Sequence, residues 1–480
     1  MKHGICAGAA ALAATLLSSA AMADGDVYAD FPITVKGYSG GKSNSVSYTG
    51  QIARHTLHDS LKKLAGSGNG SPNPELKAEM MAYFQGKEKG RAIIAPKTKG
   101  LFVLKQAAVD DISSKKNLAG KTYKGAVTGM PNNMTGPELL TFWIDRASSA
   151  NKGVDAANGY DYPQLISKFI MGAVFYNQVV DGYLDENLSA DKKPNDKPYK
   201  EGAAYTGKEH SWDEAFGYLG TPAHTLKLTP KQVYEIAKQG SKSKDPKDAV
   251  AHADYNRDGK IDLKTEMTFA PAYYAAGFDA SVYDKGNRTA YLHTITKAFL
   301  DGRKLLVKVN NAKLTDSQRR ELKGYAAVIS ENWEKVLAEA VFKYAGSTYK
   351  DLSKLQTIIE ANGDTAKVYR NYVKHWGEMK GFSLALQTGK NNLGETATHL
   401  NRLIGYGPLL PNQSQVVDID SKGNYVRDQS IKIGEYMLHM LKVQKLMSDK
   451  FGVKARNNDM LKDMKDLAGK LGSSGSAEND

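Results

Sequence analysis

The sequence predicts an all-α fold built as pseudo-duplicated helical bundles, with long loops and one small β-hairpin. Apolar residues recur mainly at spacings of three and four, which is the period of an amphipathic helix. The alternation of apolar and polar residues that is typical of a half-buried strand is scarce. A motif from the middle of the chain also recurs in its last third, which indicates two related halves.

The first residues have the pattern of a cleavable export signal. Lys2 is followed by an apolar run over residues 5–20, and residues 21–23 (Ala-Met-Ala) match a cleavage site. We expect cleavage after Ala23 and an exported protein, in the periplasm or at the cell surface. The alternative, an uncleaved anchor, is disfavoured because the run is short and is followed at once by acidic and turn residues.

Helical patterns begin after an irregular segment at 24–48 and first cover 49–66 and 74–86. The clearest helix covers 163–184, where apolar residues form one continuous seam. Further amphipathic stretches cover about 288–308, 315–345, 364–388, 391–405 and 428–450, and the hairpin falls at 414–428. The predicted organisation is a signal peptide (1–23), an irregular N-terminal segment (24–48), a first helical bundle half (49–228), an insertion (229–286), a second helical bundle half (287–455) and a polar tail (456–480).

Composition limits the chemistry of the mature chain. The only cysteine, Cys6, lies inside the predicted signal, so disulfides, thiolate catalysis and cysteine-bound zinc are excluded. The formal net charge is +13, but Lys and Arg are spread along the chain without a basic block or a nucleic-acid motif. We therefore expect no nucleic-acid partner, although the charge could favour lipid headgroups, phosphates or carboxylate chelates. No second apolar run is long enough for a transmembrane segment in the mature chain.

The recurring motif is W-x-E-x-x-G followed by an aromatic residue, with a histidine just before the tryptophan. It occurs at 210–218 and again at 375–382. The glycine lies on nearly the same helix face as the glutamate, so it would let another backbone approach closely. We expect each tryptophan to be a packing anchor whose N–H is bonded to a neighbour.

The motif also suggests a metal site. His210 and Glu214 are four residues apart, and His375 and Glu378 are three apart, so each pair shares one helix face. Imidazole and carboxylate groups bind zinc or iron, and two such pairs facing each other would supply four ligands. The alternative is local: each glutamate neutralises a nearby cation, and each histidine bonds a helix end or a loop carbonyl.

Two further features are weighed in the same way. His55 and His58 form a secondary candidate pair, for which a plain polar stripe is the alternative. No H-E-x-x-H, glycine-rich phosphate loop or G-x-S-x-G occurs, and no Ser/His/Asp set stands out.

A single calcium-type loop lies between the two halves. Its oxygen ligands alternate as in an EF-hand or dockerin loop, with Gly259 at the sixth position. The twelfth position is Thr265, and the expected acid comes one residue later. The alternative is an Asx-rich turn that caps a helix beginning near residue 266. The predicted ligands of a structural calcium ion are Asp254, Asn256, Asp258, Lys260 (through its carbonyl), Asp262 and Glu266.

Three motifs together resemble a secreted bacterial helical family related to imelysin: the recurring motif, G-Q-x-x-R-H at 50–55 and L-x-x-K-F-x-M-G-A at 165–173. The resemblance implies pseudo-duplicated helical bundles at the cell surface or in the periplasm, linked to iron uptake. The family's hallmark is G-x-H-x-x-E. His375 and Glu378 match its second half, with Val373 in place of the glycine, whereas the motif at 210 has one residue more.

These observations lead to one main expectation and two alternatives. The main expectation is a non-enzymatic binding protein for acquisition of iron, another metal or an anionic metal chelate, with an outer-membrane uptake partner. The first alternative is a metal-dependent hydrolase or peptidase, in which one glutamate acts as general base toward a metal-bound water. The second is an interaction module that holds only a structural calcium ion.

Overall fold

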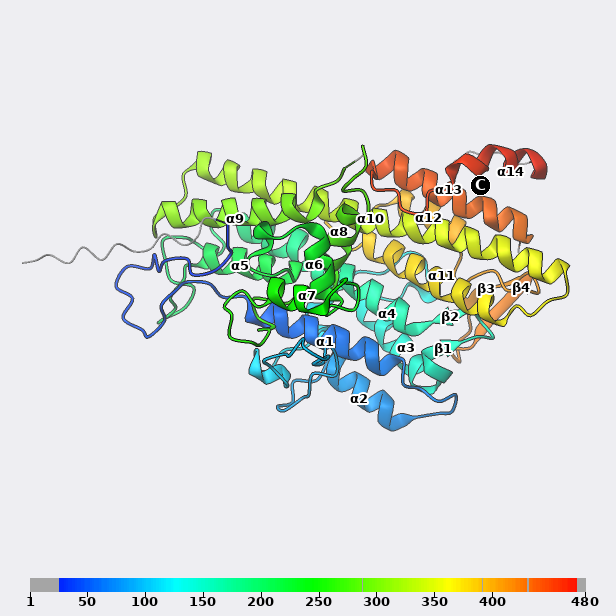
Figure 1. Ribbon diagram of the computed structural model, residues 1–480, viewed down its shortest axis with the longest axis horizontal. Coiled ribbons are helices and arrows are strands. Elements are labelled where there is room, and N and C mark those ends of the chain that lie inside the picture. Colours follow the sequence, from blue (N-terminus) through cyan, green and yellow to red (C-terminus); the bar gives the residue numbers. More distant parts are fainter. Residues whose placement is uncertain (1–25, 287, 391, 430, 473–480) are drawn as a thin grey trace, which may run out of the picture.

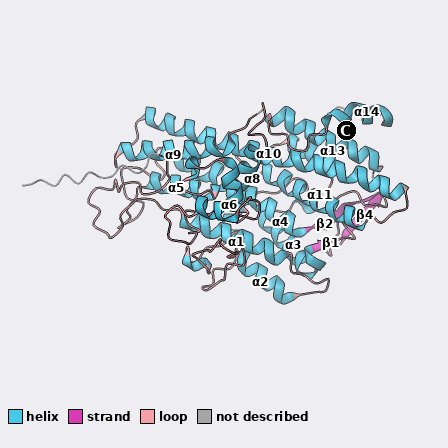
Figure 2. Ribbon diagram, in the orientation of Figure 1, coloured by secondary structure: helices cyan, strands magenta, loops and turns pink. Residues whose placement is uncertain are grey.

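The computed structural model describes residues 26–286, 288–390, 392–429 and 431–472. The predicted signal peptide and its cleavage site fall outside these ranges. Within them the chain forms fourteen α-helices and two small antiparallel sheets of two strands each, as Figure 2 shows. None of the described helices combines the length and the apolar character that crossing a bilayer requires.

The elements follow one another in this order. The helices are α1 (Thr49–Ala65), α2 (Pro74–Phe84), α3 (Gly136–Ser149), α4 (Tyr162–Ile170), α5 (Gly207–Leu219), α6 (Pro230–Ala237), α7 (Pro246–Ala253), α8 (Ala270–Ser281), α9 (Tyr291–Val309), α10 (Asp316–Glu360), α11 (Ala366–Leu386), α12 (Glu395–Ile404), α13 (Ile433–Phe451) and α14 (Met464–Leu471). The strands are β1 (Val154–Asp155), β2 (Tyr160–Asp161), β3 (Ser414–Ile419) and β4 (Tyr425–Gln429).

The long helix α10 organises the molecule. It has 45 residues, and Thr315 caps its first turn by accepting a hydrogen bond from the backbone N–H of Gln318. It runs along much of the long axis in Figure 1 and packs against α9, α11 and α13. Helix α11 in turn packs on α4, and α1 packs on α4 and α5. The strands lie together near one end of the molecule.

The predicted helices are largely confirmed, with informative differences at their ends. The hairpin at 414–428 is confirmed as β3 and β4, but the second hairpin, β1 and β2, was not predicted. Helix α10 continues past the predicted end at 345, and residues 346–349, 351, 352 and 355 of this extension are buried. The polar tail contains α14, whose Met464 and Ala468 are buried where α14 packs on α13. The helix after the calcium-type loop begins at Ala270, not near residue 266.

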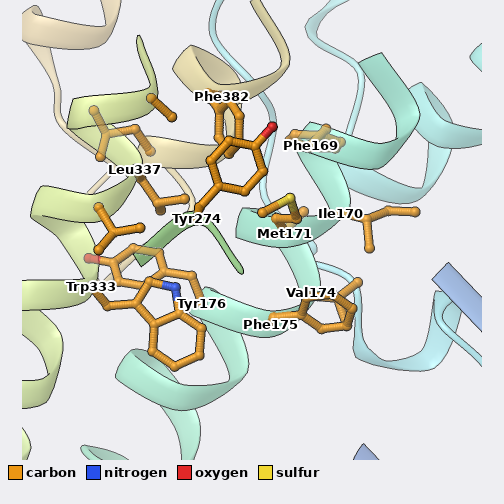
Figure 3. Packing of buried hydrophobic residues seen from close by; sticks show 14 of the residues in the cluster. Phe169, Ile170, Met171, Val174, Phe175, Tyr176, Tyr274, Trp333, Leu337 and Phe382 are labelled. Carbon is orange, nitrogen blue, oxygen red and sulfur yellow. The ribbon is translucent and has the colours of Figure 1, made fainter. Parts of the chain in front are cut away.

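The predicted long helix at 163–184 is helical throughout but changes its winding. After α4 the chain continues as two π-helical segments, η5 (Met171–Tyr176) and η6 (Gln178–Tyr183). Side chains from both α4 and η5 enter one aromatic cluster with residues of α8, α10 and α11 (Figure 3). At Gly172 the backbone of α11 comes so close that a Cβ atom would lie 2.4 Å from both Cβ and O of Ala385.

This contact yields a testable stability difference between two helical glycines. Gly172→Ala is expected to lower the free energy of unfolding by about 1–3 kcal/mol, because the new methyl group collides with backbone atoms that cannot rotate away. Gly324→Ala is the matched control on α10, since nothing lies within 4 Å of its added methyl group. That control should raise stability by about 0.5–1 kcal/mol through helix propensity. Urea unfolding of both variants measures the difference, and equal effects would contradict it.

The irregular N-terminal segment is confirmed over its described part, and a buried ionic network holds it in place. The guanidinium of Arg303 donates to Asp213 Oδ1 and Glu209 Oε1 at 2.9 Å each, and to Ser45 Oγ at 2.6 Å. The hydroxyl of Tyr28 donates to Asp213 Oδ1 at 2.8 Å. Residues from the N-terminal segment, α5 and α9 are therefore joined in one dry polar cluster.

Candidate functional site

Three adjoining cavities lie among α1, α4, α6, α8, α10 and α11. We name them the inner chamber (about 440 Å³), the outer chamber (about 400 Å³) and the side chamber (about 170 Å³), and together the cleft. Tyr273 and Tyr274 line all three. Among the described lining residues there are seven lysines against three carboxylates, those of Asp59, Glu235 and Glu378. The lysines are Lys62, Lys168, Lys231, Lys238, Lys242, Lys343 and Lys374.

Lys168 of α4 is the most deeply placed of these cations. Its side chain is 4% exposed, and its Nζ lies 3.7 Å from Glu378 Oε1, too far for a hydrogen bond. Burial lowers the pKa of Lys168 well below its usual value, and the charge of Lys62 lowers it further. The Nζ atom also lies 5.4 Å from the ring centre of Tyr274. The ammonium group therefore has weak compensation within the protein for the water that it has lost.

Two other lysines of the inner chamber also lie near aromatic rings. Lys238 Nζ lies 4.3 Å from the ring centre of Tyr273, and Lys343 Nζ lies 5.1 Å from that of Tyr344. Burial lowers the pKa of Lys343, and the charge of Lys238 adds to this effect. The cleft is therefore strongly electropositive, and its own acidic groups balance less than half of its lysines.

The tyrosines are anchored in the core. The hydroxyl groups of Tyr274 and Tyr344 lie 3.0 Å apart and share a hydrogen bond. The ring of Tyr274 meets Phe382 edge-on at 4.8 Å between centres, and Figure 3 shows it standing in the packed aromatic cluster. Burial raises the pKa of both tyrosines well above 10, so they remain neutral hydrogen-bonding groups.

The second copy of the recurring motif reaches this cleft. His375 and Glu378 both line the inner chamber. Yet each has a partner outside the motif: His375 Nδ1 lies 2.6 Å from Asp351 Oδ2, and Glu378 faces Lys168. The glutamate part of the alternative left open by the sequence is thus present, whereas His375 pairs with a carboxylate instead of a helix end or a loop carbonyl and still borders the chamber.

The first copy has different surroundings. His210 Nε2 lies 3.7 Å from Glu214 Oε2, which confirms that the two side chains share a helix face. Glu214 accepts a hydrogen bond from Gln51 Nε2 at 2.8 Å, and the His210 ring packs on Tyr199 and Tyr205. Burial lowers the pKa of His210.

The structure does not gather the two pairs into one cluster. In the part of the chain that it describes, no group of three or more His, Cys, Asp and Glu residues is arranged to hold a metal ion.

The packing roles predicted for the motif are confirmed in both copies. A Cβ atom on Gly217 would lie 2.7 Å from Tyr48 Cβ, and one on Gly381 would lie 2.6 Å from Lys168 Cβ. The buried Trp212 donates its N–H to the carbonyl of Phe299 at 2.7 Å, and Trp376 donates to the Tyr436 hydroxyl at 2.8 Å. Each glycine thus lets another segment approach its helix, α4 in the case of Gly381, and each tryptophan anchors a helix.

The secondary candidates, His55 and His58, hold α1 in place. His55 is fully buried, its Nε2 lies 3.1 Å from the carbonyl oxygen of Gly217, and burial lowers its pKa to about 3. His58 Nε2 lies 3.0 Å from both Oγ and O of Ser167, and its Nδ1 lies 3.0 Å from Asp59 Oδ1. This resembles a Ser-His-Asp set. However, a ring nitrogen so close to a carbonyl must carry the hydrogen, so it cannot accept the serine proton.

The calcium-type loop is closed by its own backbone. Asp254 accepts N–H groups of Asp258 and Gly259 at 3.1 and 2.9 Å, and Glu266 accepts the N–H of Asp262 at 2.7 Å. Glu266, although one residue late, therefore does close the loop. The ammonium of Lys105 lies 3.0 Å from Asp258 Oδ2 and lowers the pKa of Asp258.

Lys105 also lies 4.0 Å from Asp262 Oδ2, so it supplies part of the positive charge that a calcium ion would bring. Asn256 Oδ1 accepts the N–H of Asp258 at 2.9 Å, and Lys260 donates its own N–H to Asp258 Oδ1 at 2.9 Å. Calcium binding at this loop stays a prediction.

The lysines of the cleft were missed from the sequence because they are dispersed along it. They come from positions 62 to 374, and they lie on five helices, at one helix end and in one loop. One available signal was Lys168, a charged residue in the first, mostly apolar half of the predicted helix at 163–184. A buried lysine that interrupts such an apolar stretch indicates a cavity or a partner.

Comparison with known proteins gives one match. A family model described as a domain of unknown function, DUF4856, matches residues 145–254. The match covers less than a quarter of the chain and includes α4 with Lys168, and α5 with the first copy of the motif. No curated protein and no solved structure matches the chain.

Proposed function

We propose that this chain is a non-enzymatic binding protein whose cleft holds an anionic ligand, with an anionic metal chelate as the ligand class. The observation that carries the proposal is the convergence of seven lysines on adjoining chambers that three carboxylates line. Two of these lysines, Lys168 and Lys343, have pKa values lowered by burial and by neighbouring cations. A bound anion would offset both the burial of these ammonium groups and their repulsion by neighbouring cations, because it supplies a favourable interaction with each charge.

The metal part of the proposal rests on the sequence and on the position of one motif. The resemblance to the family related to imelysin implies iron uptake, export to the periplasm or cell surface, an uptake partner and a duplicated architecture. The matching roles of the glycine and tryptophan in the two motif copies support that architecture. His375 and Glu378 border the inner chamber, where a chelated metal ion would meet them.

The first test compares citrate with ferric citrate by isothermal titration calorimetry. Both should bind the wild type, and Lys168→Met should weaken both by about tenfold or more, because the variant removes the innermost cation. Lys87→Ala/Lys89→Ala is the control for charge alone, since both residues are exposed in a loop after α2 and line none of the three chambers. Failure of both ligands to bind would overturn the proposal.

The two alternatives are separated in the same samples. A metal-dependent hydrolase requires chelator-sensitive turnover that is lost in Glu214→Ala or Glu378→Ala. An interaction module with structural calcium requires that these substitutions alter stability while no anion binds.

The affinity for anions is expected to fall with rising pH already in the range below the ordinary lysine pKa of about 10.4. The lowered pKa values of Lys168 and Lys343 mean that these groups lose their protons below the usual range, and the neutral amines attract anions less. Binding should therefore take up protons, which calorimetry in buffers of different ionisation enthalpy detects. Tyr274 and Tyr344 stay neutral over this interval. An affinity independent of pH would contradict the assignment of these lysines to the site.

A further inference from the structure

The three chambers adjoin one another, because several residues line more than one of them. Lys343, Tyr273 and Tyr274 line both the inner and the outer chamber. Lys168 and Lys238 line both the inner and the side chamber. The inner and outer chambers each have more than ten times the volume that one water molecule occupies in the liquid, about 30 Å³. Each therefore has room for a charged group with several atoms.

Positive charge is distributed along this space and becomes more buried toward its inner end. In the outer chamber Lys231 is 68% exposed, and its Nζ lies 3.8 Å from Glu235 Oε1. Lys242 of the same chamber is also exposed. Lys343 stands at the boundary and is partly buried, whereas Lys168 in the inner chamber is 4% exposed. Such a gradient attracts an anion at the entrance and holds it where water is scarce.

A compact anion would meet only part of this array. If it sits beside Lys168, the outer Lys231 and Lys242 line a different chamber and contribute only long-range attraction, which salt screens. A longer ligand can place one charged group in each chamber and pass between them along Tyr273 and Lys343. The neutral hydroxyl of Tyr274, which already bonds that of Tyr344, adds polar but uncharged surface at the crossing.

We propose that the cleft selects an extended polyanion whose charged groups occupy the inner and the outer chamber at the same time. This inference rests on the proposed anion-binding function and adds a requirement for length and for several separated charges. The shared chemistry is a linear chain of phosphate or carboxylate groups. Lys343, at the boundary, contacts the middle of such a ligand, and Lys168 and Lys231 contact its two ends.

The test is a length series at fixed ionic strength, with inorganic phosphate, pyrophosphate and tripolyphosphate titrated into the full chain. Wild-type affinity should rise by about tenfold or more from phosphate to tripolyphosphate. Lys231→Ala/Lys242→Ala should remove most of that gain, with a smaller loss of phosphate affinity. Both residues are exposed, so the variant should keep the wild-type melting temperature. A parallel series from acetate to tetraglutamate distinguishes a carboxylate chain from a phosphate chain.

Lys87→Ala/Lys89→Ala is again the control, because it removes the same formal charge outside the cleft. Equal affinity for phosphate and tripolyphosphate would overturn the extended-ligand inference and leave the anion site in place. An equal loss of tripolyphosphate affinity in Lys231→Ala/Lys242→Ala and in the control would also overturn the extended-ligand inference. If no anion of either series binds while citrate does, the extended-ligand inference alone fails. If citrate and ferric citrate also fail to bind, the proposed function fails as well, so the two failures are distinguishable.

Discussion

Arg303→Met is expected to lower the free energy of unfolding by about 3–5 kcal/mol. The guanidinium and both carboxylates that it pairs with, those of Glu209 and Asp213, are fully buried. Without Arg303 these carboxylates would have to remain charged in a dry environment or take up protons. Burial already raises the pKa of Asp213 to about 6 even with the arginine in place.

The same substitution also frees the N-terminal segment, because Arg303 Nη2 donates to Ser45 Oγ. The charge-matched control is Arg319→Met. The guanidinium of Arg319 pairs with the exposed Asp316, so its removal should lower the free energy of unfolding by less than about 1 kcal/mol. Urea unfolding compares the two variants. A triple variant, Arg303→Met with Glu209→Gln and Asp213→Asn, should recover part of the loss because no buried charge is left unpaired. An Arg303→Met effect as small as that of the control would contradict the network.

Trp376→Ala is expected to lower the free energy of unfolding by about 3–5 kcal/mol, because it removes the largest side chain of the second motif copy and leaves a cavity in the core. Trp376 meets Tyr160 edge-on at 5.8 Å between ring centres and donates its N–H to the hydroxyl of Tyr436. That hydroxyl donates in turn to the carbonyl of Ile404 at 2.6 Å, so the tryptophan fastens α11 to α12 and α13.

Trp376→Phe separates packing from the hydrogen bond. This variant keeps an aromatic ring and leaves the Tyr436 hydroxyl bonded to Ile404. The free energy of unfolding is therefore expected to fall by only about 1–2 kcal/mol. Thermal unfolding ranks the two variants, and citrate affinity of the phenylalanine variant should match the wild type, since Trp376 lines none of the three chambers. A loss of affinity at unchanged stability would show that this tryptophan has a direct role in binding.

Much of the fold was accessible from local pattern. The helices α1 and α2 end where glycines and loop signals predicted, and β3 and β4 pair as the turn residues indicated. The roles of the motif's glycine and tryptophan were also correct. The second hairpin was missed because strands of two residues carry no periodic signal. The ordered helix α14 was missed because the polar composition of the tail outweighed its few apolar residues.

The candidate site could be anticipated only in part. His375 and Glu378 do border the inner chamber, as a site assigned to that motif would require. Their immediate partners, Asp351 and Lys168, lie 24 and 210 positions away from them in the chain, and no local spacing reveals such contacts. The same distance in sequence hid the network that Arg303 forms with Glu209 and Asp213.

By itself the sequence determined where the long amphipathic helices form, where the hairpin turns and which motif residues pack, because these depend on near neighbours in the chain. It also determined an excess of positive charge without showing where that charge gathers. Only the tertiary structure decided that lysines from α1, α4, α6, α10 and α11 share one cleft. The physical reason is that a charge acts through space. Residues spread evenly along the chain become a concentrated field once helices bring them within a few ångströms of one cavity.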